Sequence, residues 1–232
     1  MPYSSTNKWL ALALLAAAQF VVILDASIVN VALPSIGRDL HFSQDNLSWV
    51  VNAYVLVFGG FLLLGGRLAD LLGRRRLFII GLVLFAIASL AGGLAQSEGW
   101  LIAARAVQGL GAALLSPAAL SLVTVLFAEG AERNKAMGVW GAVAGSGGAV
   151  GVLLGGMLTE WAGWEWVLFV NVPIGIAAAI LAPRMLPESR NVGERHFDIA
   201  GAITITSGLS LLVYTLVDAN SAGWGSLQTI GL

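Results

Sequence analysis

The chain has 232 residues, of which 58% are hydrophobic and 11% are charged. A typical soluble protein has about 25% charged residues, so this composition excludes a soluble globular domain and indicates that most of the chain is embedded in lipid. Twelve basic residues against thirteen acidic ones give no electrostatic basis for binding nucleic acid, and the lack of cysteine excludes disulfides and thiolate chemistry.

Seven apolar runs approach the length of about 20 residues that a membrane-spanning helix needs. In chain order, these runs are residues 9–31, 47–64, 77–94, 101–127, 137–158, 167–181 and 199–217. Pro173 and Gly175 interrupt the sixth run, but neighbouring helices can satisfy the backbone groups that a proline frees. The sequence therefore predicts an all-α polytopic membrane protein.

The basic residues indicate how these spans are oriented. If the amino terminus is cytoplasmic, ten of the twelve basic residues fall in cytoplasmic segments, and only Arg38 falls outside. The ten are Lys8, Arg67, Arg74, Arg75, Arg76, Arg133, Lys135, Arg184, Arg190 and Arg195. The positive-inside rule therefore predicts a cytoplasmic amino terminus, and seven crossings then leave the carboxyl terminus outside.

Two charged residues, Asp25 and Arg105, lie inside predicted spans, where a charge costs roughly 2.5 to 3.5 kcal/mol. At a rise of about 1.5 Å per residue, Asp25 lies about 24 Å from the inner surface, and Arg105 lies about 8 Å below the outer surface on a helix of opposite direction. This shared depth predicts that both face one cavity and that protonation of Asp25 weakens their pairing. Two alternatives remain: Arg105 reaches outward to the lipid headgroups, or Asp25 has a purely structural role.

Other polar residues in the predicted spans could line a cavity. They are Gln19, Asn30, Asn52, Tyr54, Gln108 and Asn171. The candidates for substrate contact are Asn30, Asn52, Tyr54 and Gln108. Hydrogen bonding between helices explains any single member equally well.

Glycines recur at spacings of three or four residues in the fifth predicted span. They are Gly141, Gly145, Gly148, Gly151 and Gly155. This spacing predicts one flat face along the helix, and we take Gly148, Gly151, Gly155 and the adjacent Gly156 as helix-packing residues. Close packing alone explains such a face as well as sliding of one helix against another does.

The densest charged element is the segment 66–76, between the second and third predicted spans. Asp70 and Arg74 are four residues apart, a spacing that allows an ion pair if the helix continues. Gly66 and Gly73 permit a close approach and a turn. A solvated loop that only fixes topology would explain the arginines but not Asp70 or the glycines.

This segment resembles the signature between helices two and three of major facilitator superfamily transporters. Residues 24–34, 105–111 and 151–156 are similar to three further motifs of that superfamily. Residues 24–34, together with residues 164–166 and 171–175, resemble the fourteen-helix drug:proton antiporter branch. The likeness is to the amino-terminal half of such a transporter.

The resemblance implies a six-helix amino-terminal bundle of the major facilitator fold at residues 1–185, a charged cytoplasmic linker at 186–198, and a seventh helix with an outside segment at 199–232. It implies export of amphipathic drugs or antibiotics in exchange for protons across the cell membrane, with the proton gradient as energy source and no cofactor. The implied partners are the lipid bilayer, a small-molecule substrate, and a missing carboxyl-terminal half or another copy of the chain.

The resemblance also implies roles for individual residues. Asp25 and Arg105 would couple transport to protons. The residues of the conformational latch would be Gly66, Asp70, Gly73 and Arg74.

Two positions depart from the family pattern. Val152 stands where antiporters usually have proline, and Glu165 replaces the arginine that usually separates two tryptophans. Valine can preserve a packing face but not the helix distortion that a proline introduces.

The alternative function is a truncated, non-transporting membrane fragment that binds partner helices. An enzyme is not expected, because His41 and His196 fall in loops on opposite sides of the membrane, and no paired carboxylates or serine–histidine arrangement lies inside the predicted helices. The sequence contains no phosphate-binding glycine loop, so we do not expect ATP to drive transport.

Overall fold

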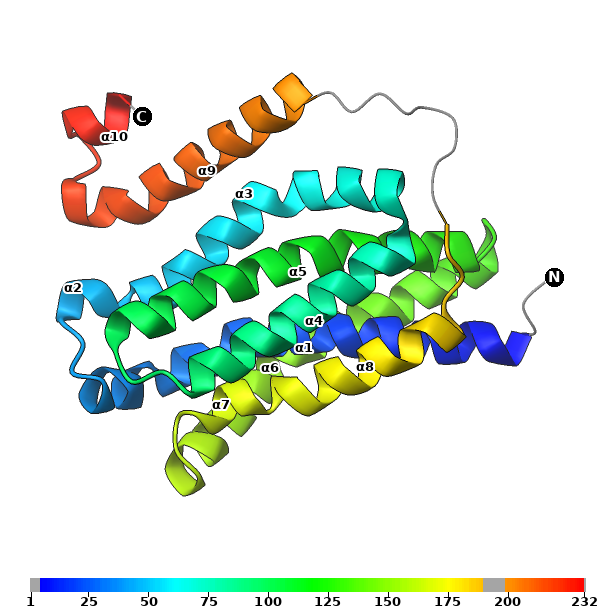
Figure 1. Ribbon diagram of the computed structural model, residues 1–232, viewed down its shortest axis with the longest axis horizontal. Helices are drawn as coiled ribbons and strands as arrows, with labels where there is room; N and C mark the ends of the chain where they lie inside the picture. Colours follow the sequence, from blue (N-terminus) through cyan, green and yellow to red (C-terminus); the bar gives the residue numbers. More distant parts are fainter. Residues whose placement is uncertain (1–4, 190–198, 232) are drawn as a thin grey trace.

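The computed structural model describes residues 5–189 and 199–231, and within these ranges the chain forms ten α-helices (Figure 1). They are α1 Ser5–Asp39, α2 Gln44–Leu47, α3 Trp49–Leu72, α4 Arg74–Gly93, α5 Glu98–Leu126, α6 Ala131–Trp161, α7 Trp166–Phe169, α8 Asn171–Met185, α9 Ile199–Ala222 and α10 Leu227–Gly231. The long helices run side by side in an elongated bundle, and α9 packs along α3.

The first six predicted spans are confirmed as helices that are long and apolar enough to cross a membrane. They cover Lys8–Asp39, Trp49–Leu72, Arg74–Gly93, Glu98–Leu126, Ala131–Trp161 and Trp166–Met185. The seventh predicted span is also helical, as α9, but its described apolar stretch, Ile203–Leu216, is shorter. Within the predicted linker, residues 190–198 lie outside the described residues, and the division into domains stays a prediction.

Two helices, α1 and α3, each continue eight residues beyond the carboxyl end that the hydropathy pattern predicts, from 31 to 39 and from 64 to 72. α1 continues through Pro34 to Asp39, because a proline in a helix leaves only one carbonyl, that of Asn30, without its usual amide donor. α3 continues to Leu72, so most of the segment 66–76 is helical and not a loop. The actual turn is a single residue, Gly73, whose φ of 111° lies in the region that favours glycine.

The sixth predicted span is divided into the short helix α7 and the longer helix α8. The division falls at Val170, just before Asn171, and Pro173 lies in the first turn of α8. A proline is tolerated there because the first amides of a helix have no partner within the helix. The break brings the first residue of α8, Asn171, into the protein interior, where its side chain is fully buried.

α5 runs through the middle of the bundle and packs closely against α3 and α4. Glycine makes this approach possible, because a Cβ on Gly65 of α3 would overlap the carbonyl oxygen of Ala113 on α5. A Cβ on Gly111 of α5 would lie 2.6 Å from the backbone nitrogen of Phe85 on α4. The close approach predicted at Gly66 therefore occurs one residue earlier, since a Cβ on Gly66 would make only an ordinary contact, 3.6 Å from Pro117.

The glycine face of α6 is also rotated from the predicted one. Gly147, Gly151 and Gly155, four residues apart, pack against α1, and a Cβ on Gly151 would lie 2.8 Å from Cβ of Ser27. Gly151 and Gly155 therefore lie at the contact with α1, and Gly148 meets α1 through its carbonyl oxygen, which accepts from Oγ of Ser27 at 2.8 Å. Around Gly148 and Gly156, no described atom lies within 4 Å of an added Cβ. Glycines four residues apart lie nearly in line on a helix with 3.6 residues per turn, so Gly147, Gly151 and Gly155 form one line of contact. The predicted set mixed spacings of three and four residues and did not separate this line.

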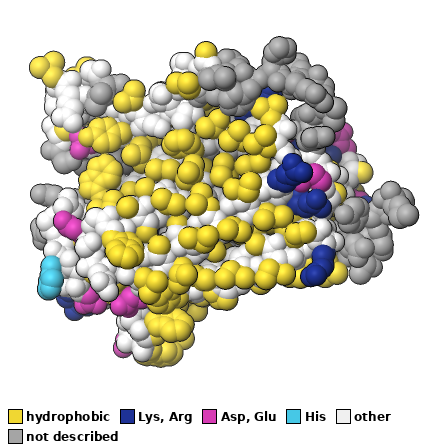
Figure 2. Space-filling model, in the orientation of Figure 1, with side chains coloured by type: hydrophobic (Ala, Val, Ile, Leu, Met, Phe, Trp, Pro, Cys, Tyr) yellow, Lys and Arg dark blue, Asp and Glu magenta, His cyan; other side chains and the backbone are white. Residues whose placement is uncertain are grey.

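The outer surface of the bundle is strongly apolar. Hydrophobic side chains cover the middle of the face shown in Figure 2, and charged side chains lie toward its two ends. Large side chains such as Leu63, Ile87 and Leu153 are more than half exposed. A surface of this kind is stable in lipid hydrocarbon and would be costly in water.

Candidate functional site

The two intramembrane charges form a buried ion pair. Arg105 of α5 donates from Nη1 to Oδ2 of Asp25 on α1 at 2.6 Å, although the two residues are 80 positions apart. The side chains are 1% and 0% exposed, respectively. The two residues meet as predicted, and Arg105 does not reach the lipid headgroups, but they do not face a shared cavity as predicted, because both side chains are buried and neither lines the cavity described below.

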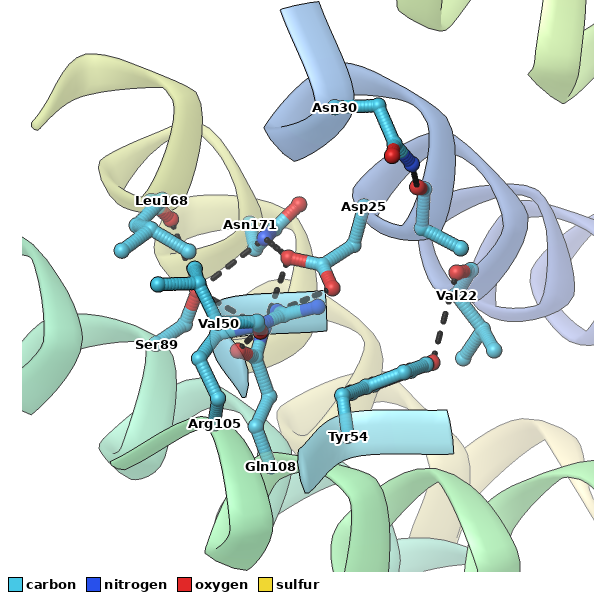
Figure 3. A network of polar contacts seen from close by, with 11 residues as sticks. Val22, Asp25, Asn30, Val50, Tyr54, Ser89, Arg105, Gln108, Leu168 and Asn171 are labelled. Carbon is cyan, nitrogen blue, oxygen red and sulfur yellow. Dashed lines mark hydrogen bonds and ion pairs between the residues drawn. The ribbon is translucent and has the colours of Figure 1, made fainter. Parts of the chain in front are cut away.

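Neutral polar side chains complete the environment of Asp25 (Figure 3). Oδ1 of Asp25 accepts from Nε2 of Gln108 at 2.8 Å and from Nδ2 of Asn171 at 2.7 Å. Both amide groups also donate to Oγ of Ser89 on α4, at 3.1 Å and 3.0 Å. The Ser89 hydroxyl in turn donates to the carbonyl oxygen of Leu168 at 2.8 Å, so the network joins α1, α4, α5, α7 and α8.

Arg105 is held by three further contacts. Its Nε donates to the carbonyl oxygen of Val50 at 3.1 Å, and its Nη1 donates to Oε1 of Gln108 at 2.6 Å. The guanidinium carbon lies 4.4 Å from the centre of the Tyr54 ring. A buried ion pair is tolerated only when such additional bonds offset the cost of removing both charges from water.

The sequence did not reveal how this network is completed. Asn171 is one of several polar residues in the predicted spans, and nothing in the sequence singles out Ser89. A serine inside an apolar helix is a weak signal, because serine can bond to its own helix. Only the position of α4 beside α5 and α8 shows that Ser89 accepts hydrogen bonds from the side-chain amides of Gln108 and Asn171.

The candidates for substrate contact lie in different environments. Tyr54 and Gln108 are fully or almost fully buried, and Gln108 belongs to the network around Asp25. Asn30 is exposed and donates to the carbonyl oxygen of Ala26 on its own helix. Asn52 on α3 is half-buried. Their contact with a substrate stays a prediction.

A cavity of about 540 Å³ lies elsewhere, among α1, α3, α5 and α6. Its lining residues are Gln19, Phe58, Leu62, Leu63, Gly66, Arg67, Asp70, Ser116, Pro117, Leu120 and Trp140. The walls are mainly apolar and aromatic with a few polar groups, which is typical of small-molecule sites. The four predicted contact residues are not among those that line it, whereas Gly66 and Asp70 of the predicted latch are.

The predicted latch contains an ion pair at the junction of α3 and α4. Arg74 donates to Oδ1 of Asp70 from Nη2 at 2.8 Å and from Nε at 3.2 Å. The pair forms although Gly73 ends the helix between the two residues. Its side chains are 14% and 32% exposed, so water reaches them.

A segment that falls in the predicted linker holds this junction in place. Glu188 accepts a hydrogen bond from the backbone nitrogen of Arg75 at 3.2 Å and lies 3.6 Å from its Nε. The backbone nitrogen of Arg74 donates to the carbonyl oxygen of Ser189 at 2.9 Å. A carboxylate is favourable here because the first backbone amides of α4 have no acceptor within the helix and the helix dipole is positive at this end. No sequence pattern singled out Glu188, because its nearness to Arg75 and Arg76 arises only when the chain folds.

Among the described residues, no group of three or more His, Asp and Glu side chains could hold a metal ion. The functional group of the site is the buried carboxylate of Asp25, which accepts from one guanidinium and two amide groups.

Comparisons with known proteins agree with this architecture. A family model described as the Major Facilitator Superfamily matches residues 15–229. The chain is 50% identical to the puromycin resistance protein pur8 of Streptomyces alboniger over 97% of its length, and 50% identical to the cephamycin export protein CmcT of Amycolatopsis lactamdurans over 93%. It spans 45% of each of these proteins, or about half the length of the curated relatives it matches.

A solved structure also shares the fold. The crystal structure of a peptide transporter POT mutant in complex with sulfate superposes with a TM-score of 0.70, covering 94% of this chain and 48% of that one. The sequences are 15% identical, so this likeness shows the fold alone.

Proposed function

The chain belongs to the major facilitator superfamily, and we propose from this membership and its buried ion pair that it works in the proton-driven export of amphipathic antibiotics or drugs. The relatives named for puromycin resistance and cephamycin export support the substrate class. They favour an exporter over a non-transporting fragment that binds partner helices. The chain is a multi-pass membrane protein, and we place it in the plasma membrane with the amino terminus in the cytoplasm, because of its positive-inside pattern.

The observation that carries the coupling proposal is the Asp25–Arg105 pair. Protonation of Asp25 would neutralise the carboxylate and leave Arg105 as the single charge of the pair, which weakens their attraction in a region of low dielectric. Because α1 and α5 each contribute one member, a weaker pair allows these helices to move relative to each other. A proton bound from one side and released to the other would thereby bias the conformation of the bundle.

The latch would act at the opposite end of the bundle. The Asp70–Arg74 pair and Gly73 fix the angle between α3 and α4, and Asp70 also lines the cavity. A substrate in the cavity would lie beside this junction, where its presence can favour one position of α3. We propose that this contact links substrate binding to the rocking movement by which such transporters alternate access.

The test uses the full chain in proteoliposomes with an imposed pH gradient and follows efflux of ethidium, a lipophilic cation dye. The wild-type chain should move the dye only when the gradient is present. Asp25→Asn should abolish the dependence on the gradient, whereas Asp39→Asn, the same change at an exposed position on α1, should leave it intact. Gradient-driven efflux that survives Asp25→Asn unchanged contradicts coupling through this residue, and no efflux by the folded wild-type chain contradicts the proposed function.

A further inference from the structure

We propose that Asn171 is a positioning residue that changes from hydrogen-bond donor to hydrogen-bond acceptor when Asp25 takes up a proton. The inference rests on the proposed function, because it concerns the same proton. It adds a way for the same buried neighbours to form hydrogen bonds with Asp25 in both its charged and its protonated form. The switch consists of a half-turn of the Asn171 side-chain amide.

The need for a switch follows from the donors around Asp25. In the structure, Oδ1 receives N–H groups from Gln108 and Asn171, and Oδ2 receives one from Arg105. These contacts suit a carboxylate, which only accepts hydrogen bonds. A protonated carboxyl carries an O–H donor, and that donor would point at another N–H unless a neighbour presents an acceptor.

Only one of the three neighbours is free to turn. Arg105 has no acceptor atom. Gln108 is fixed at both ends of its amide, because Oε1 accepts from Nη1 of Arg105 at 2.6 Å while Nε2 donates to Asp25. A half-turn of Gln108 would place its NH₂ group against the guanidinium.

Asn171 differs from Gln108 in this respect. Its Oδ1 is buried and has no hydrogen-bond partner among the described residues, while its Nδ2 lies 2.7 Å from Oδ1 of Asp25 (Figure 3). Rotation about χ2 exchanges the oxygen and nitrogen positions in nearly the same volume, and this torsion of asparagine is soft and roughly two-fold. After the half-turn, Oδ1 of Asn171 would accept the new O–H of Asp25.

Ser89 can follow this change without leaving its place. Its hydroxyl now accepts from Nδ2 of Asn171 and donates to the carbonyl oxygen of Leu168. A hydroxyl rotates freely, so it can donate to the turned Asn171 oxygen instead. The Leu168 carbonyl gives up the Ser89 hydrogen bond in the turned state.

The two states differ in the groups left unpaired. Before the half-turn the Asn171 oxygen has no partner among the described residues, and after it the NH₂ group of Asn171, with two N–H bonds, takes that position, so the turned amide is held only by the O–H of protonated Asp25 and by Ser89. The proton binds to Oδ1 of Asp25 and leaves from the same atom, and no other bond forms or breaks. The charged or titratable side chains that interact with Asp25 are Arg105 from α5 and Tyr54 from α3, whereas the contacts from α4 and α8 come from neutral groups.

The experiment is infrared difference spectroscopy on the full chain in lipid, comparing high and low pH after labelling all asparagines with ¹³C at the side-chain carbonyl. Protonation of Asp25 should produce a carboxyl band that is missing in Asp25→Asn. In the wild-type chain, the labelled asparagine carbonyl band should shift to lower wavenumber together with it, because the Asn171 oxygen gains a donor. This measurement needs no substitution at Asn171, so it stands even if such variants fold poorly.

Asn171→Leu provides the second readout. The carboxyl band of protonated Asp25 should move to higher wavenumber when its O–H loses the acceptor, and gradient-driven ethidium efflux should fall roughly tenfold. Asn134→Leu, at an exposed position on α6, is the matched control and should change neither. An asparagine band that stays fixed while Asp25 titrates, a carboxyl band unaltered by Asn171→Leu, or no band that Asp25→Asn removes overturns the inference.

These outcomes are separate from the test of export. Gradient-driven efflux with a fixed asparagine band overturns the switch and leaves the proposed function standing. A shifting asparagine band in a chain that moves no dye supports the switch and overturns the proposed function.

Discussion

The bundle contains two carboxylate–guanidinium pairs with similar contact distances, of which one is buried and the other is partly exposed to water. Asp25 and Arg105 meet at 2.6 Å with both side chains almost completely buried. Asp70 and Arg74 meet at 2.8 Å, but 32% of the Asp70 side chain is exposed. The first pair joins two helices that are distant in sequence, whereas the second spans one turn at a helix junction. Burial therefore distinguishes the two pairs more than contact distance does, because the first pair is stabilised only by fixed protein groups, whereas water solvates the second.

The largest expected effect comes from removing one member of the buried pair. Arg105→Met should lower the free energy of unfolding by about 3 to 5 kcal/mol, because it leaves the Asp25 carboxylate buried without its counter-charge. The double variant Asp25→Asn with Arg105→Met should recover much of this loss. Thermal unfolding of the purified chain in detergent measures both values. An Arg105→Met chain as stable as wild type would mean that the pair is not buried as described.

The next effect concerns the turn of the latch. Gly73→Ala should destabilise the chain by about 2 kcal/mol, because alanine is strained at a φ of 111° and its Cβ would lie 2.6 Å from Oε1 of Glu188. Gly138→Ala, inside α6 with no described atom within 4 Å of the added Cβ, is the matched control and should be neutral or stabilising. The same thermal assay compares the two. Equal effects would show that the conformation of Gly73 is not needed.

A smaller effect is expected for the exposed pair itself. A double-mutant cycle with Asp70→Asn and Arg74→Gln should give a coupling energy below about 1 kcal/mol, because water screens both charges. The corresponding cycle for Asp25 and Arg105 should give a larger value. Similar coupling energies in the two cycles would remove the contrast between the two regions.

The smallest effect should come from salt. Raising the ionic strength from about 0.1 M to 1 M shortens the Debye length from about 10 Å to 3 Å, so the coupling between Asp70 and Arg74 should weaken further. The coupling between Asp25 and Arg105 should remain unchanged, since ions do not reach a buried pair. Repeating both cycles at the two salt concentrations measures this. A salt-sensitive buried pair would indicate that water penetrates to Asp25.

The sequence predicted two members of the buried polar network better than it predicted their connections. The cost of charge in lipid singled out Asp25 and Arg105, and the rise of a helix placed them at one depth. The same reasoning could not identify Ser89, because its role depends on which side of α4 faces α5 and α8. It also missed Gly147, whose Cβ position faces α1, because one residue turns a helix by about 100°.

The order of the first six helices that could cross a membrane and their approximate extent follow from the sequence alone, because apolar length depends only on position along the chain. Only the tertiary structure decided how the helices are rotated about their axes and which distant groups meet. It brought Asn171 to Asp25 through the break between α7 and α8, and Glu188 to the start of α4. These contacts arise from close packing among several helices at once, and no local pattern in the chain records that packing.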